Sequence, residues 1–280
     1  MNVLVVGATS SLAQALIPLL RGQCDVLTAG RNGCDIELDL SSRDIKIPAG
    51  IDCVVNMAAA FGGKDFSASL QAMDVNVLGL MKLCHASSRA GAKHLVHVSS
   101  IFSDLASDSS FFGAYALSKR HSEEVAQFCA RECRLPIAVL KPSQIYGVGG
   151  QFRKHQPFLY TIMDKAERNE DIELFGSNDP LRNFIHAQDV ARIVLAAIMM
   201  KIEGAYPCVN PDNVSYSQIA AAAISAFDSK SKVRFLKDRP DIPSNGFACD
   251  ETLFRLVGCF PRISIAQGMQ MEAAYRGRAS

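Results

Sequence analysis

Tyr115 and Lys119 are the residues of this chain whose types and spacing most clearly suit chemistry. They are four positions apart, and residues four apart on a helix share a face, so a helix here directs the phenol and the ammonium to one place. A free phenol has a pKa of about 10, which a neighbouring cation lowers. Ser100 follows a predicted strand and can hold a substrate oxygen while Tyr115 exchanges a proton with it. This trio suits interconversion of an alcohol and a carbonyl.

The pair also has a plainer interpretation, in which Tyr115 packs in a core and Lys119 extends into water.

The composition limits the kinds of partner that the protein is expected to bind. The chain has 280 residues, 49% of them hydrophobic, and a net charge of +1 without a basic block. This balance argues against nucleic acid as a partner and favours a small ligand.

The nine cysteines show no Cys-x-x-Cys spacing, which predicts reduced thiols in a cytoplasmic protein. Cys129 and Cys133 share a helix face, but no histidine or acidic residue lies at a useful spacing, so packing is a better interpretation than metal binding. The apolar run from Val3 to Val6 is too short for a signal peptide or a membrane span. We therefore expect no metal and no membrane association.

Short β-branched runs alternate with longer helical stretches, a pattern typical of parallel strands joined by crossover helices. The predicted strands are Asn2 to Val6, Asp25 to Ala29, Asp35 to Leu38, Cys53 to Asn56, His94 to Val98 and Ile137 to Leu140. The predicted helices are Ser11 to Arg21, Ser67 to Ala90 and Ala114 to Cys133. The fold class is thus α/β, a doubly wound Rossmann sheet whose ligands bind at the carboxyl ends of the strands.

After Tyr146 the alternation breaks down among several prolines. We expect a dinucleotide-binding domain over 1–147 and 184–209, and a smaller α/β substrate lobe over 148–183 and 210–280.

The first strand runs into a glycine turn and a helix start, where free N–H groups attract a pyrophosphate. The glycine spacing is degenerate, because Ser10 and Ala13 occupy positions where dinucleotide-binding turns usually have glycine, and a turn without a ligand remains an alternative. The second strand ends at Arg31, where an NAD site normally has an acidic residue. Arg31 suits a 2′-phosphate, so NADP(H) is favoured and NAD(H) remains open.

Six segments, in order along the chain, resemble the extended short-chain dehydrogenase/reductases, which include nucleotide-sugar epimerases, dehydratases and 4-keto reductases. They are Val54-Val55-Asn56-Met57-Ala58-Ala59, Asn76-Val77-Leu78-Gly79, Val98-Ser99-Ser100, Tyr115 with Lys119, Lys141-Pro142-Ser143-Gln144-Ile145-Tyr146-Gly147, and Arg182-Asn183-Phe184-Ile185-His186-Ala187-Gln188-Asp189-Val190-Ala191.

This resemblance implies roles for individual residues. Ser100, Tyr115 and Lys119 are the expected catalytic residues. The expected cofactor-binding residues are Gly7, Thr9, Ser10, Ser11, Leu12, Arg31, Asp39, Leu40, Ala58, Ala59, Asn76, Tyr115, Lys119 and Pro142. The expected substrate-binding residues are Ser100, Phe102, Tyr115, Ser143, Arg182 and Arg239.

Arg182 and Arg239 match arginines that bind the diphosphate in nucleotide-sugar enzymes, although surface salt bridges are the alternative. Planar guanidinium groups give bidentate contacts to phosphate oxygens.

The chain lacks catalytic residues that two groups of enzymes in this family use. The Asp-Glu pair with which 4,6-dehydratases eliminate water is replaced by Ile101 and Phe102. Phe102 and Arg153 stand where GDP-fucose synthases have a cysteine and a histidine.

The expected function is therefore NAD(P)-dependent reduction of the 4-keto group of a nucleotide-activated sugar, with Tyr115 as proton donor. The interval from Ser100 to Tyr115 (115 − 100 = 15 positions) is shorter than in most enzymes of the family that the chain resembles. Some sugar-nucleotide reductases are similarly compact here, so the resemblance favours a reductase. The short interval also leaves Ser99 and Ser103 as substitutes for Ser100. The alternatives are a 4-epimerase with bound NAD and a non-catalytic dinucleotide-binding regulatory protein. The resemblance also implies a homodimer.

Overall fold

The structure is a computed structural model that describes residues 1–63 and 65–279. The described residues form two compact units. The first comprises 1–142, 190–208 and 251–260, and the second comprises 143–189, 209–250 and 261–279. The expected domain division differs in giving 143–147, 184–189 and 209 to the first domain and 251–260 to the second.

A parallel sheet is the centre of the first unit. Within the described residues it has seven strands in the order β11-β6-β5-β4-β1-β2-β3. The strands are β1 (Asn2–Val6), β2 (Asp25–Gly30), β3 (Ile36–Glu37), β4 (Cys53–Asn56), β5 (His94–Val98), β6 (Ile137–Pro142) and β11 (Gly204–Cys208). This arrangement confirms the predicted doubly wound α/β fold.

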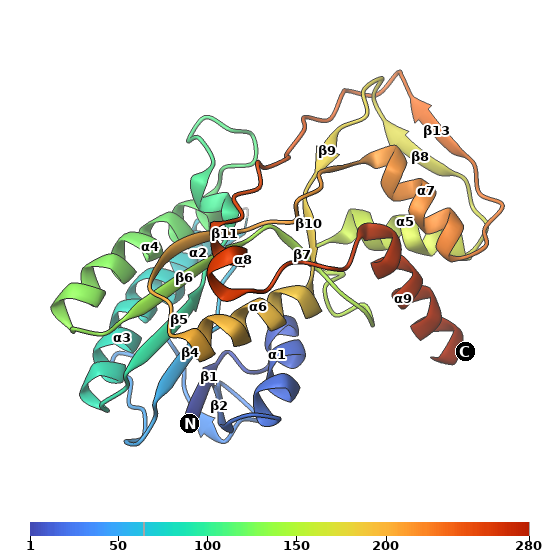
Figure 1. Ribbon diagram of the computed structural model, residues 1–280. Coiled ribbons are helices and arrows are strands. Elements are labelled where there is room, and N and C mark those ends of the chain that lie inside the picture. Colours follow the sequence, from blue (N-terminus) through green and yellow to red (C-terminus); the bar gives the residue numbers. More distant parts are fainter. Residues whose placement is uncertain (64, 280) are drawn as a thin grey trace. The chain divides into compact units, whose positions relative to one another are not determined.

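Helices cover both faces of this sheet, with α3 and α4 on one side and α1 and α6 on the other (Figure 1). The helical segments of this unit are α1 (Ser11–Arg21), α2 (Phe66–Met73), η1 (Asp74–Leu78), α3 (Gly79–Arg89), η2 (Ile101–Asp104), α4 (Ala114–Glu132), α8 (Thr252–Val257) and most of α6 (Ala187–Met200). Because both faces are covered, β1 after Asn2 and the whole of β5 are buried continuously rather than at alternate residues. Leu4, Leu83 and Cys129 are all buried in one core cluster.

The predicted helix from Ser67 to Ala90 is interrupted. It consists of α2, a π-helical turn η1 and α3, and η1 holds the buried Asn76. A π-helical turn inserts one residue and re-aims a side chain, and such turns occur often at functional sites. The amphipathic pattern predicted the helix but not this change of winding.

The second unit is built from small pieces of sheet and three helices within the described residues. Its elements are β7 (Gln144–Tyr146), α5 (Pro157–Glu167), β8 (Ile172–Phe175), β9 (Leu181–Arg182), β10 (Phe184–His186), β12 (Val214–Ser215), α7 (Tyr216–Ala226), β13 (Val233–Leu236) and α9 (Ile265–Ala279). Strand pairs β7 with β10, β8 with β13 and β9 with β12 form two-stranded sheets. Across 1–63 and 65–279, no helix has the length and apolar character needed to cross a membrane.

Candidate functional site

The carboxyl end of β5 brings the three predicted catalytic residues together. Ser100 lies two residues after β5, and Tyr115 and Lys119 lie in the first turns of α4. The Ser100 hydroxyl faces the Tyr115 hydroxyl closely enough to lower the pKa of Tyr115. The Lys119 Nζ atom lies 5.9 Å from the centre of the Tyr115 ring. The arrangement places two hydroxyls and an ammonium within one small region.

The electrostatics of Tyr115 differ from the sequence-based expectation. Burial raises the pKa of Tyr115 to about 12, and the Ser100 hydroxyl opposes this only in part. The net shift of this pKa is therefore upward, whereas the expected shift was downward. At neutral pH Tyr115 retains its proton, which suits a proton donor.

Lys119 is fully buried, with 1% of its surface exposed. Its ammonium donates a hydrogen bond of 2.9 Å to the carbonyl oxygen of Val98 in β5. Burial lowers the pKa of Lys119 to about 8, and the charge of Glu123 opposes that shift. The charge of Lys119 thus depends on a small number of neighbouring groups.

The two substitutes for Ser100 point elsewhere. Ser99 Oγ donates a hydrogen bond of 2.6 Å to Glu123 Oε1, and Ser103 Oγ donates one of 2.8 Å to the Ser100 carbonyl. Ser100 is accordingly the serine of this group whose hydroxyl acts on Tyr115.

Asn76 connects the loop after β4 to α4. Its Oδ1 accepts a hydrogen bond from the Ala60 N–H (2.8 Å), and its Nδ2 donates to the Ala60 carbonyl (2.7 Å) and to Ser118 Oγ (2.9 Å). Ser118 in turn donates to the Tyr115 carbonyl at 2.8 Å. The π-helical turn at Asn76 therefore fixes both the loop and the start of α4.

Sequence reasoning missed Phe61, which stacks on Tyr115. The two ring centres are 4.9 Å apart and the rings are inclined by 15°. Phe61 is half exposed, in the loop that Asn76 holds through Ala60. The signal available in the sequence was an aromatic residue just after a buried strand, which is too common to interpret.

The turn after β1 fits a dinucleotide. Gly7 has φ +77°, and a Cβ built there would lie 2.5 Å from the Ala58 nitrogen. Ser10 caps α1 by accepting the Ala13 N–H at 3.3 Å, so Ser11 and Leu12 form the first turn of that helix. A tight glycine turn followed by a helix amino terminus is what a pyrophosphate needs, even though two of the usual glycines are replaced.

Arg31 is exposed and follows β2 directly. Its charge is near Asp39, whose pKa is lowered mainly by hydrogen bonds from the Ser41 backbone and side chain, with a contribution from Arg31. Leu40 is buried and lies against Gly79 at the start of α3. A cation and an acid thus lie together beyond the ends of β2 and β3.

The end of β6 presents polar atoms that have no hydrogen-bond partner. Pro142 ends β6, and the next residues carry two such buried atoms, Ser143 Oγ and Gln144 Oε1. His186 Nε2 is a third, on β10, which pairs with β7. Burial lowers the pKa of His186 to about 4, so its ring is neutral at pH 7. Unpaired buried polar atoms require an explanation, and a ligand or ordered water supplies one.

The two arginines predicted to bind a diphosphate have different surroundings in the second unit. Arg182 is buried and donates to the Tyr216 hydroxyl (2.7 Å) and the Pro243 carbonyl (2.9 Å). Arg239 is exposed and lies over the Phe175 ring at 5.7 Å. Arg182 is therefore the more rigidly held of the two.

The short segment between Ser100 and Tyr115 is tied to α4. Arg120 donates to the Ser103 carbonyl at 2.9 Å and also to the Leu105 carbonyl, and its guanidinium lies 4.7 Å from the centre of the Phe112 ring. Phe102 is half-buried in this segment. These contacts give the segment a defined conformation, although its only helical turn is η2.

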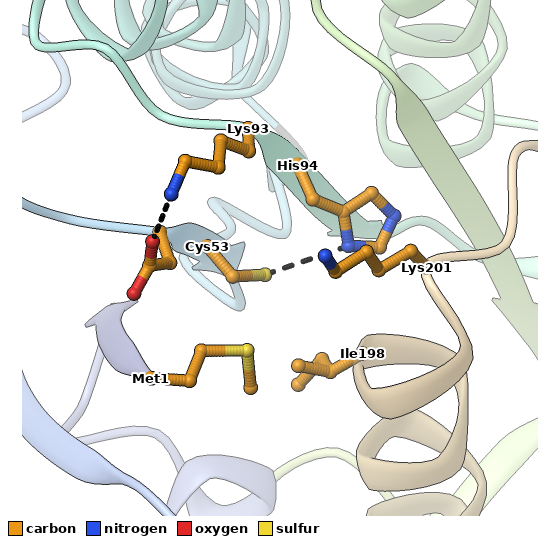
Figure 2. A pocket seen from close by; sticks show the side chains of 7 residues that line it. Met1, Cys53, Lys93, His94, Ile198 and Lys201 are labelled. Carbon is orange, nitrogen blue, oxygen red and sulfur yellow. Dashed lines mark hydrogen bonds and ion pairs between the residues drawn. The ribbon is translucent and has the colours of Figure 1, made fainter.

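A cavity of about 180 Å³ lies away from these residues, where β4 and β5 begin (Figure 2). Cys53 and His94 line it, with Sγ and Nδ1 3.6 Å apart, and His94 Nε2 lies 2.8 Å from the Ile202 carbonyl. Burial raises the pKa of Cys53 to about 12 and lowers that of His94. Both groups are therefore neutral at pH 7, and their bonds connect β4, β5 and the segment after α6.

Comparison with known proteins is decisive for the family. The profile of the NAD dependent epimerase/dehydratase family matches residues 3–207. The chain belongs to this family. The resemblance inferred from six short segments is thereby confirmed.

Individual relatives are distant. A dTDP-4-dehydro-6-deoxy-D-allose reductase of Streptomyces is 26% identical over 212 residues, 68% of this chain and 64% of that protein. The chain thus matches less than two thirds of that relative's length. A UDP-glucose 4-epimerase of Thermotoga maritima, solved with UDP-glucose, has a TM-score of 0.79 at 17% identity and covers 100% of this chain and 99% of its own. The enzyme WbmF of Bordetella bronchiseptica, solved with NADH, has a TM-score of 0.82 at 19% identity, with 99% and 92% covered.

The Gly7 turn yields a test of the close approach to Ala58. Gly7→Ala adds both an unfavourable positive φ and a collision with backbone, whereas Gly91→Ala adds only the φ term, since Gly91 has φ +80° and no described heavy atom within 4 Å of a built Cβ. We expect a loss of about 1 kcal/mol in the free energy of unfolding for Gly91→Ala and about 3 kcal/mol or more for Gly7→Ala. Urea unfolding measures both, and equal losses would contradict the close approach.

Proposed function

We propose that this protein reduces the 4-keto group of a nucleotide-activated sugar with a nicotinamide cofactor. The observation that carries the proposal is the contact between Ser100 and Tyr115 beside the buried ammonium of Lys119. A protein that only binds a dinucleotide has no need of a phenol placed next to a second hydroxyl and a buried cation. A regulatory role without catalysis is therefore the weaker alternative.

Ser100, Tyr115 and Lys119 each have a separate role in the proposed reaction. A bound nicotinamide supplies a hydride to the carbonyl carbon. Ser100 hydrogen-bonds the carbonyl oxygen, and Tyr115 donates its phenolic proton to that oxygen, which completes the alcohol. Lys119 stabilises the resulting phenolate and holds the nicotinamide ribose. The raised pKa of Tyr115 supports the reducing direction, because the phenol enters the reaction protonated.

The cofactor is held by the edge of the sheet in this proposal. Gly7, Thr9, Ser10, Ser11 and Leu12 bind the pyrophosphate at the start of α1. Asp39 and Leu40 contact the adenine, and Ala58, Ala59, Asn76 and Pro142 border the rest of the cofactor. NADP(H) is favoured over NAD(H), because Arg31 is exposed at the end of β2 and can pair with a 2′-phosphate.

The substrate proposal rests on the second unit and on the relatives. Arg182 and Arg239 bind the diphosphate, with Arg182 held in place by Tyr216. Ser143 supplies a buried hydroxyl that lacks a partner, and Phe102 contacts the sugar. The Streptomyces relative is named for reduction of a dTDP-sugar, which supports the same chemistry here.

Dehydration and epimerisation fit less well. Ile101 and Phe102 follow Ser100, so the acid pair needed to eliminate water is missing. A 4-epimerase retains its NAD through the cycle. Purification of the protein with bound NAD, together with no consumption of added NADPH, would favour that alternative.

A homodimer in the cytoplasm is part of the proposal. Phe66, Leu70, Leu78 and Met81 are exposed along α2, η1 and α3, and Phe128 is exposed on α4. Apolar side chains grouped on neighbouring helices are typical of a surface covered by another chain, and a second copy of this chain would cover the same helices on each protomer. All nine cysteines are free in the described residues, as expected for a reducing compartment.

Tyr115→Phe tests the proton donor. The variant lacks the phenolic proton, so we expect reduction to fall at least about 1,000-fold while cofactor affinity stays within about threefold. Nicotinamide absorbance, followed with NADPH and with NADH against a panel of 4-keto nucleotide sugars, measures turnover. Tyr275→Phe on the exposed α9 is the matched control. Normal turnover by Tyr115→Phe would remove Tyr115 from the mechanism.

The dimer is tested with Leu78→Asp. A carboxylate on this exposed position would be buried and unpaired in a dimer, so light scattering should show a monomer at concentrations where the wild type is dimeric. Leu256→Asp, on the exposed side of α8, is the control and should leave the mass unchanged. A wild type that is monomeric throughout would overturn this part of the proposal.

A further inference from the structure

A cluster of charged side chains lies directly behind the reacting residues. Glu123 on α4, Lys141 on β6 and Asp104 at the end of η2 belong to three different elements of the first unit. Lys141 Nζ lies 2.6 Å from Asp104 Oδ1 and 3.7 Å from Glu123 Oε2. The side chains of Lys141 and Glu123 are only 11% and 13% exposed. Buried charges of this kind are costly unless they are paired, so their position calls for an explanation.

Glu123 connects this cluster to the catalytic set in two ways. Its Oε1 accepts a hydrogen bond of 2.6 Å from the hydroxyl of Ser99, the residue before Ser100. It is also four positions after Lys119 on α4, and residues at this spacing are neighbours on one face of a helix. Glu123 is thus next to both the backbone that carries Ser100 and the ammonium beside Tyr115.

We propose that Glu123 is a positioning residue, whose carboxylate keeps Lys119 charged and fixes the end of β5 so that Ser100 meets Tyr115. Lys141, tied to Asp104, keeps Glu123 ionised in turn. This inference deepens the proposed function and rests on it. In this scheme Glu123, Lys141 and Asp104 touch neither the substrate nor the cofactor.

The charges facing these groups agree with the scheme. Lys119 faces the Val98 carbonyl and the neutral, buried His97 from β5, and Tyr115 and Glu123 from its own helix. Burial raises the pKa of Glu123, and the hydroxyl groups of Ser103 and Ser99 and the charge of Lys141 oppose the rise, whereas Asp104 adds to it. The charge of Glu123 raises the pKa of Lys119. Removing that carboxylate therefore lets Lys119 lose its proton at lower pH.

Glu123→Gln is the direct test, since glutamine keeps an oxygen that can accept from Ser99 but has no charge. Cofactor affinity, measured by nicotinamide fluorescence from pH 6 to 10, requires no substrate. Affinity should weaken at high pH as Lys119 deprotonates. In Glu123→Gln this weakening should begin about one pH unit lower than in the wild type. Glu124→Gln is the matched control, because Glu124 is exposed and pairs with His121 at 3.0 Å; it should leave the profile unchanged.

Two further variants keep the test decisive if Glu123→Gln does not fold. Glu123→Asp retains the charge and should restore a profile close to that of the wild type. Lys141→Met removes the cation that keeps Glu123 ionised and should shift the profile in the same direction as Glu123→Gln. A lower melting temperature with an unchanged pH profile would show a purely structural role and overturn the inference. Failure of the wild type to bind either cofactor would overturn the proposed function and this inference together.

Discussion

The burial of one positive charge is the constraint on which the site depends. Lys119 is 1% exposed, and an ammonium without compensating groups at such a depth would cost several kcal/mol. The Val98 carbonyl accepts a hydrogen bond from the ammonium, and Glu123 supplies an opposite charge from the next turn of α4. A phenol beside such a cation can give up its proton, because the cation then stabilises the phenolate. This attraction is stronger in the buried site than it would be in water at the surface.

The parallel sheet explains why residues far apart in sequence gather at one side of the first unit. Strands that run in one direction end at one edge, so β4, β5 and β6 deliver Asn56, Ser100 and Lys141 to the same side. The π-helical turn then aims Asn76 at the loop after β4, where Phe61 stacks on Tyr115. The polar groups are thus held by backbone elements with little freedom, which is what a preorganised site needs.

The sequence allowed much of this to be predicted. β1, β4 and β5 begin and end at the predicted residues, because buried parallel strands are short apolar runs bounded by glycine or polar residues. The π-helical turn was missed, since the apolar pattern of this segment does not distinguish it from an α-helix. The direction of the Tyr115 pKa was also wrong, because burial depends on the folded surroundings. Glu123 and Lys141 carried a signal, an acid four positions after Lys119 and a lysine inside an apolar strand, that only the fold made interpretable.

In the proposed reaction, a nicotinamide hydride reaches a sugar carbonyl beside these side chains. Transfer of deuterium tests it most directly. The protein is incubated with a 4-keto nucleotide sugar, such as a dTDP-4-dehydro-6-deoxyhexose, and NADPH or NADH deuterated on both C4 positions of the nicotinamide. We expect a product with one deuterium at the reduced carbon, detected by mass spectrometry and NMR. Reduction that leaves this carbon without deuterium, or no reduction across a panel of such sugars, would contradict it.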